Sequence, residues 1–131
     1  MFLNANVAKF TLITNDKSKV ELNLKSDDAV LELSKNSNIK ALITSSKLKC
    51  DLYQKTTAVL EGDVNELRLR MDNSSSFTGK NLTSKTATVV LEGTSQGIIN
   101  VATTANLALS GKSELYLYGE AVVEIKVFKD E

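Results

Sequence analysis

Three glutamates are the residues of this chain whose type and spacing could support chemistry. They are Glu32, Glu61 and Glu92, and each follows a short apolar run that recurs roughly every thirty residues. Two carboxylates on either side of a glycosidic bond can act as the acid and as the base or nucleophile of its hydrolysis. A row of outward carboxylates can instead form a weak cation-binding or ligand-contact stripe. A polysaccharide-active enzyme is therefore one function that the sequence must be tested against.

The fourth copy of the run has aromatic residues where a glutamate would be expected. Tyr116 and Tyr118 lie there, and tyrosine rings can stack on sugars. An active site needs groups with different roles in a cleft, whereas this pattern repeats one role along a face. We therefore predict that Glu32, Glu61, Glu92, Tyr116 and Tyr118 form a column of surface contacts without a catalytic role.

The composition argues against most other chemistry. The chain has no histidine, so it lacks the usual acid–base group, metal ligand and activator of a serine or cysteine nucleophile. Glycine-rich phosphate-binding motifs are also missing from the sequence. The one cysteine, Cys50, alternates with Leu48 and Leu52 and is predicted to be a small buried hydrophobe. We predict no enzymatic activity, no cofactor and no metal site.

Charge and hydropathy exclude two classes of partner. Sixteen basic residues balance sixteen acidic ones, so no net positive field would attract nucleic acid. No stretch approaches the roughly 18 consecutive apolar residues of a membrane-spanning helix. The first residues also lack the pattern of a secretory signal peptide. The partner class that remains is a protein or a glycan.

The elements that must position these residues are short strands. The recurring run alternates apolar and mixed positions before a small residue, as is typical of a half-buried strand that ends at a corner. Its four copies are Ala29–Leu33, Ala58–Gly62, Val89–Gly93 and Leu115–Gly119. Further alternating segments follow, separated by polar turns that we expect at residues 36–38, 73–75 and 103–106. Period-two patterning and β-branched residues together predict an all-β domain.

Repetition of such units favours a β-solenoid over an antiparallel sandwich. Tight hairpins are typically marked by Asn-Gly or Asp-Gly, and the chain contains neither dipeptide. We predict a parallel β-solenoid with about three strands per coil and a repeat of roughly 26–31 residues. Leu31, Leu60, Leu91 and Leu117 would then point inward and lie above one another. The antiparallel sandwich remains the alternative.

The beginning of the sequence corresponds to only part of a coil. Residues 10–12 and 20–24 resemble the second and third strands of a unit, and residues 1–7 only hint at the first. We expect residues 1–131 to form a single domain that is the C-terminal part of a longer one. An uncovered solenoid end exposes strand edges and core. Upstream residues, a partner chain or self-association through the ends would cover it.

The C-terminal half resembles a known family. The segments that carry the resemblance are residues 89–95, 106–113, 115–119 and 123–128, with a Ser-Gly-Lys-Ser turn in the second. They look like the auto-transporter adhesin, head GIN domain family, which is found mostly in Bacteroidetes. The resemblance implies a right-handed parallel β-helix in an exported or envelope-associated protein, with no established enzymatic activity.

The sequence as a whole therefore predicts a structural or binding module. Its leading interpretation is an adhesin-like interaction domain of a bacterial cell-envelope protein, with an unknown protein or glycan as partner. Two alternatives remain open. One is a polysaccharide-active enzyme that uses the outward glutamates, and the other is a scaffold that self-assembles through the solenoid ends.

Overall fold

The chain folds into a stack of parallel β-coils. The computed structural model describes residues 2–120 and 122–128, and within them nine strands form one continuous sheet around a core. The strands are β1 (Phe2–Asn6), β2 (Lys9–Asn15), β3 (Lys19–Ser34), β4 (Asn38–Leu52), β5 (Thr57–Met71), β6 (Ser76–Leu91), β7 (Gln96–Leu109), β8 (Glu114–Tyr118) and β9 (Val122–Phe128). Each strand pairs with its neighbours in parallel. The predicted β-solenoid is confirmed, and the sandwich is wrong.

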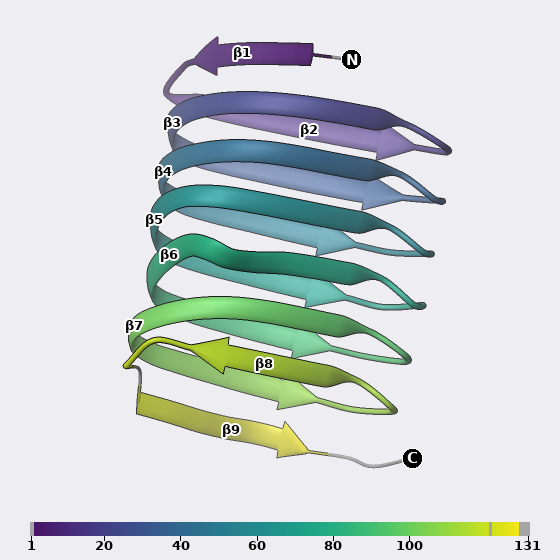
Figure 1. Ribbon diagram of the computed structural model, residues 1–131, viewed down its shortest axis with the longest axis vertical. Coiled ribbons are helices and arrows are strands. Elements are labelled where there is room, and N and C mark those ends of the chain that lie inside the picture. Colours follow the sequence, from purple (N-terminus) through teal and green to yellow (C-terminus); the bar gives the residue numbers. More distant parts are fainter. Residues whose placement is uncertain (1, 121, 129–131) are drawn as a thin grey trace.

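Each coil has two sides. The long strands β3 to β7 bend near their midpoints, so that the first half of each lies on one side of the stack and the second half on the other (Figure 1). We call the side that contains β1 and β8 face 1, and the side that contains β2 and β9 face 2. The predicted three strands per coil are wrong, because strand pairing continues through the corner and joins two of the expected segments into one strand.

The repeat is shorter than the sequence indicated. It is about 19 residues long and makes about six turns, so that Lys19 of β3 pairs with Asn38 of β4. The recurring apolar run instead returns after about one and a half coils. Its copies therefore alternate between the faces, with Ala29 on face 2 and Ala58 on face 1. Both faces need inward apolar and outward polar residues in alternation. The same pattern therefore recurs on each face, and it does not show whether two copies are separated by one coil or by one and a half.

The coils wind in a right-handed sense. Descending from the N-terminus, the chain crosses the near side from right to left and the far side from left to right (Figure 1). Nearly all parallel crossovers have this hand, because right-twisted strands pack back onto their own sheet only in this way. The hand implied by the family resemblance is therefore the observed one.

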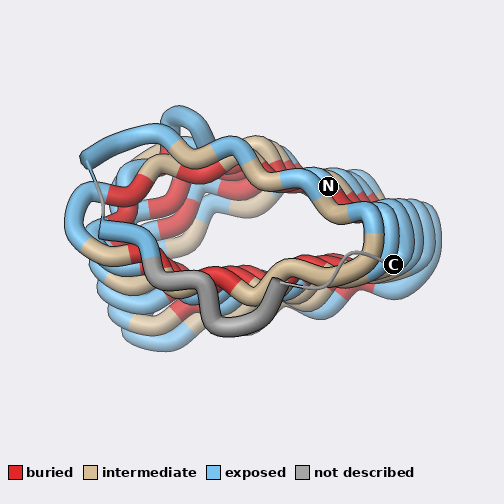
Figure 2. The backbone as a smooth tube through the Cα atoms, turned by 90° about the horizontal axis from the view of Figure 1, so that it is seen from below, coloured by how far each residue is buried: buried red, intermediate tan, exposed pale blue. Residues whose placement is uncertain are grey.

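The core fills the space between the two faces. Along β3 to β7, buried positions alternate with more exposed ones on both sides of the stack (Figure 2). Leu31, Leu60 and Leu91 are buried, and Leu117 packs against the core in the last coil, so their predicted inward orientation is confirmed. Their predicted stacking in one column is wrong, since Leu31 and Leu91 lie on face 2 while Leu60 lies on face 1.

A tight turn with the same hydrogen bond closes successive coils. Ser37, Thr56, Ser75 and Ser95 are buried, and each hydroxyl donates to the backbone carbonyl three residues earlier at 2.6 to 2.8 Å. Ser113 makes the equivalent bond in the last turn. Because these hydroxyls lie at buried positions, the bonds provide partners for polar groups that would otherwise be unsatisfied.

Left-handed backbone conformations allow these turns to be short. Among the residues that the structure describes, the non-glycine residues with positive φ are Asp16, Lys17, Lys35, Asn36, Gln54, Lys55, Asn73 and Ser74. Two consecutive left-handed residues reverse the chain direction over a minimal length. The turns predicted at residues 36–38 and 73–75 fall on these reversals. The turn predicted at residues 103–106 is wrong, because these residues continue β7 past its corner.

Candidate functional site

The structure separates the three glutamates. Glu32 lies half-buried on β3 of face 2, in register with Asp51. Glu61 lies exposed on β5 of face 1, in register with Leu42. Glu92 follows β6, at the turn that leaves face 2. The predicted glutamate column is wrong, because the spacing of these residues corresponds to about one and a half coils and places successive members on opposite faces.

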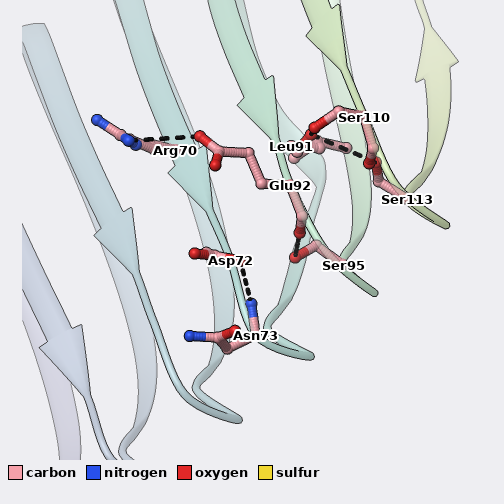
Figure 3. Close-up of polar contacts among 8 residues, drawn as sticks. All are labelled: Arg70, Asp72, Asn73, Leu91, Glu92, Ser95, Ser110 and Ser113. Carbon is pink, nitrogen blue, oxygen red and sulfur yellow. Dashed lines mark hydrogen bonds and ion pairs between the residues drawn. The ribbon is translucent and has the colours of Figure 1, made fainter. Parts of the chain in front are cut away.

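This placement does not provide the paired carboxylates of a glycosidase. The two carboxyl groups of such enzymes lie about 5 to 9.5 Å apart across one bond, whereas Glu32 and Glu61 lie on opposite sides of the core. Glu92 forms an ion pair with Arg70, with 3.3 Å between Oε1 and Nη2 (Figure 3). No group of three or more His, Cys, Asp or Glu in the described part of the chain could hold a metal ion.

Face 2 presents charged side chains that neutralise one another. In its first outward column, Lys9, Asp28, Lys47 and Glu66 follow one another in register, so that the sign of the charge alternates from coil to coil. Opposite charges on adjacent strands attract, each pair contributing roughly 0.2–1 kcal/mol. This column therefore stabilises the stack and has no net charge, because its two lysines balance its two acidic residues.

Asp51, on the outward side of β4, and Cys50, on its inward side, are adjacent residues with raised pKa values. Burial raises the pKa of the Asp51 carboxyl, Glu32 adds to the rise, and the nearby cations Lys49 and Arg70 oppose it. The Lys49 Nζ lies 4.0 Å from Asp51 Oδ2. Burial, assisted by the charge of Asp51, also raises the pKa of the Cys50 thiol. Cys50 is fully buried, as predicted, and such a thiol is inert because the reactive species is the thiolate.

The C-terminal part of face 1 is uncharged along one outward column. In register from β5 to β8, this column contains Val59, Thr78, Ile98 and Tyr116. The first three are half-buried, and Tyr116 is 55% exposed. Tyr118 lies two positions further along β8, which places it on the same face, and it is 43% exposed. We call these five residues the tyrosine strip.

A lysine from two strands away reaches the edge of the tyrosine strip. The Nζ of Lys80, on β6, lies 4.9 Å from the centroid of the Tyr118 ring, within the range of a cation–π interaction. Between them lies β7, whose Asn100 is in register with Tyr118. The Asn100 Nδ2 donates to the Lys80 backbone carbonyl at 3.2 Å. This hydrogen bond connects the backbone of Lys80 on β6 to Asn100 on β7, the residue that lies beside Tyr118 in the sheet.

A bulge in β6 makes this reach possible. The register between β6 and β7 shifts between Thr78 and Thr83, and the first half of β6 rises visibly out of line in Figure 1. Gly79 is buried at the start of the bulge, where an added Cβ would overlap the ring of Phe77. A glycine inside a strand is the sequence signal for such a bulge, and it could have pointed to Lys80, which the sequence analysis missed.

Of the five residues predicted to form a contact column, the structure brings together only Tyr116 and Tyr118. Glu61 shares their face, but it lies on β5, three strands away in the sheet. The prediction that these side chains contact a ligand stays a prediction, now confined to the tyrosine strip.

One of three comparisons with known proteins finds a match for this chain. No curated protein and no solved structure matches the chain. The described residues contain no helix long and apolar enough to cross a membrane. A family model matches residues 5–121, which contain the whole tyrosine strip and extend the resemblance seen in the C-terminal half to nearly the entire solenoid. The chain therefore belongs to the family described as "Putative auto-transporter adhesin, head GIN domain".

Proposed function

We propose that this chain is a non-enzymatic, adhesin-like binding module that holds an extended glycan on the tyrosine strip. The observation that carries the proposal is the exposure of Tyr116 and Tyr118 at successive outward positions of β8, next to an uncharged column. Membership of an adhesin-type family supports a binding role. The absence of histidine from the sequence and the separation of the glutamates support a module without catalysis.

The chemistry of the strip fits a sugar chain. Alternate residues on a strand lie about 6.6 Å apart, so the two tyrosines can each stack on a different sugar ring. A pyranose offers an apolar C–H face to such a ring and hydroxyl groups at its rim. Asn81, which follows Lys80, and Glu120, two residues after Tyr118, are exposed and can exchange hydrogen bonds with hydroxyl groups.

The shape of the surface supports an extended ligand. Sites for small molecules are concave and enclose most of the ligand, whereas the tyrosine strip runs over the outward side of a sheet in register from β5 to β8. A chain of sugars laid across these strands would contact several coils at once. Lys80 would restrain the ring of Tyr118 before binding, which lowers the conformational entropy lost on association.

Retention of the purified chain on a panel of immobilised glycans tests the proposal. Tyr116→Ala and Tyr118→Ala are each expected to weaken binding roughly fivefold, because an aromatic stacking contact contributes about 1 kcal/mol. Leu42→Ala is the matched control, since Leu42 is 48% exposed on the same face but lies outside the strip. Thermal melting establishes that all three variants fold. Unchanged binding by both tyrosine variants would place the site elsewhere.

A second assay addresses the absence of catalysis. The chain is incubated with polysaccharides and the release of reducing ends is measured, with Glu61→Gln and Glu92→Gln alongside. No release is expected from any of the three proteins. Hydrolysis that either substitution abolishes would overturn the non-enzymatic assignment.

An exported or cell-envelope location follows from the same proposal. It is supported by the adhesin-type family. Fractionation of cells that express the native gene should recover the protein from the envelope or the medium. Recovery from the cytoplasm alone would contradict this part of the proposal.

A further inference from the structure

Both ends of the described solenoid leave the hydrophobic core partly uncovered. The apolar residues that pack against the core but are only partly buried are Leu3, Ala5, Phe10 and Leu12 in the first coil and Leu109, Leu115 and Leu117 towards the last. Their counterparts one coil further in are closed off, with Leu22 at 3% and Leu31 at 0% exposure. Covering the ends would remove this apolar surface from water, at roughly 25 cal/mol for each Å².

The same ends carry unpaired strand edges. Among the described strands, β1 and β2 pair only with β3, and β8 and β9 pair only with β7. The Val7 N–H donates to the Lys25 carbonyl at 3.0 Å. Since successive peptide groups of a strand point to opposite sides, the N–H of Asn4 faces the open edge. Exposed edges are normally protected by charges or proline, and β1 contains neither.

One buried hydroxyl at the N-terminal end also lacks a partner. Of the buried side-chain nitrogen and oxygen atoms in the described residues, Thr14 Oγ1 is the one that forms no hydrogen bond. Thr14 lies on β2, the outermost strand of face 2, and is 7% exposed. Leaving a buried donor unsatisfied costs about 1–3 kcal/mol. A strand laid against β2 would bring backbone carbonyls to this side of the coil.

The two ends are complementary to each other. Because all pairings are parallel, β8 of one copy runs in the same direction as β1 of a copy stacked against it, and β9 in the same direction as β2. Followed through every coil, the column that begins at Phe2 ends at Tyr116. Phe2 is 68% exposed and Tyr116 is 55% exposed. Stacking would continue this column across the junction as an aromatic pair.

We propose that copies of this chain associate head to tail, with β8 and β9 of one copy pairing with β1 and β2 of the next. Each junction continues both faces of the solenoid, covers the partly buried apolar residues and places Tyr116 beside Phe2 of the following copy. The contact uses different surfaces on the two copies, so it does not close, and the product is a series of growing linear oligomers.

Light scattering and sedimentation of the chain over a wide range of concentration test this proposal. The mean mass is expected to climb continuously as concentration rises. Phe2→Lys should weaken association roughly tenfold, because it removes the aromatic contact and places a charge at the junction. Leu42→Lys is the matched control, since it introduces the same charge at an exposed apolar position of face 1 in an interior coil. It should leave the mass distribution unchanged.

A backbone variant tests the edge pairing separately. Asn4→Pro removes an N–H group that faces the open edge and obstructs a neighbouring strand, so it should reduce the mass towards that of a monomer. Asn4→Ala keeps the N–H group and should assemble like the wild type. Thermal melting of both variants separates loss of assembly from loss of folding.

A pair of opposite charges introduced at the junction tests the direction of stacking. Tyr116→Glu should weaken association on its own and restore it when combined with Phe2→Lys, because the junction then contains an opposite pair. A mass that stays at the monomer value at every concentration would overturn the proposal. A mass that stops at a dimer and is insensitive to Tyr116→Glu would also overturn it, since two N-terminal ends would then be in contact. The mass is measured without a glycan, and Phe2 lies outside the tyrosine strip, so the outcome for Phe2→Lys is independent of the result of the glycan assay.

Discussion

The ammonium nitrogen of Lys80 lies 4.9 Å from the ring centroid of Tyr118, although strand β7 separates the two residues in the sheet. The contact exists because β6 departs from the regular repeat, with a register shift that begins after Thr78. The bulge in β6 therefore brings the Lys80 ammonium group beside the exposed tyrosines of face 1.

The first prediction concerns the energy of this contact. In a double-mutant cycle of Lys80→Met and Tyr118→Leu, the coupling energy should be about 0.5–1 kcal/mol, the range of exposed cation–π pairs. Urea unfolding of the four proteins measures it. Lys85→Met is the control, since Lys85 is an exposed lysine of the same strand. A coupling energy indistinguishable from that of Lys85→Met with Tyr118→Leu would show that the contact contributes nothing.

The second prediction concerns the corner of β5. Gly62 has a φ of +121°, and a Cβ added there would overlap the backbone oxygen of Ile43 on the neighbouring coil. Gly62→Ala should therefore lower the free energy of unfolding by more than about 3 kcal/mol, as expected for strain combined with a backbone clash. Glu61→Ala, at the exposed position before it, should change stability by less than about 0.5 kcal/mol. Equal denaturation midpoints for the two variants would contradict this account.

The third prediction concerns the buried hydroxyls of the turns. The Thr56 hydroxyl donates to the Tyr53 carbonyl at 2.6 Å, and Thr56 is fully buried. Thr56→Val keeps the shape of the side chain but leaves this carbonyl unsatisfied, at a cost of about 1–3 kcal/mol. Thr57→Val makes the same change at the adjacent exposed position and should be close to neutral. Chemical denaturation compares them, and a similar loss in both would mean that the turn hydrogen bond is not the cause.

The fourth prediction concerns pH. Burial raises the pKa of Asp51 in the folded chain, so the unfolded chain releases this proton at a lower pH than the folded chain does. Between the two pKa values the unfolded state binds fewer protons, and the free energy of unfolding therefore falls as pH rises. Asp51→Asn removes this penalty and should raise the melting temperature at neutral pH.

The gain from Asp51→Asn should disappear at acid pH. Below the ordinary aspartate pKa of about 3.9, both states of the wild type are protonated and the substitution changes little. Asp63→Asn removes one charge at an exposed position and controls for the change in net charge. A stabilisation by Asp51→Asn that is equally large in acid would rule out ionisation as its origin.

Much of the fold could be predicted from residue patterns. Alternation identified the strands and the inward side chains, including Leu60, Leu91 and the buried Cys50. The lack of hairpin dipeptides correctly favoured parallel stacking. These features depend on whether a side chain faces water or the core, and the polarity of each residue type indicates which of the two it prefers.

The length of the coil could not be read in the same way. Glu32 and Glu61 follow similar apolar runs, yet they lie on opposite faces. Coil length depends on where the corners and turns fall, and here many turns use Lys, Asn, Gln and Ser in left-handed conformations where glycine would be the recognisable signal. The glutamate column was predicted wrongly for the same reason. Residues form a surface column only if they are one coil apart, and the predicted repeat was too long.

The amino-acid sequence by itself determined the strand content, the parallel stack and the division of side chains between core and surface. Tertiary structure decided which outward residues are neighbours: it separated the glutamates, kept Tyr116 with Tyr118, and brought Lys80 to them. The physical reason is that burial is a property of each residue in turn, whereas the neighbours on a solenoid face are set by backbone hydrogen bonds between coils, which any residue type can form.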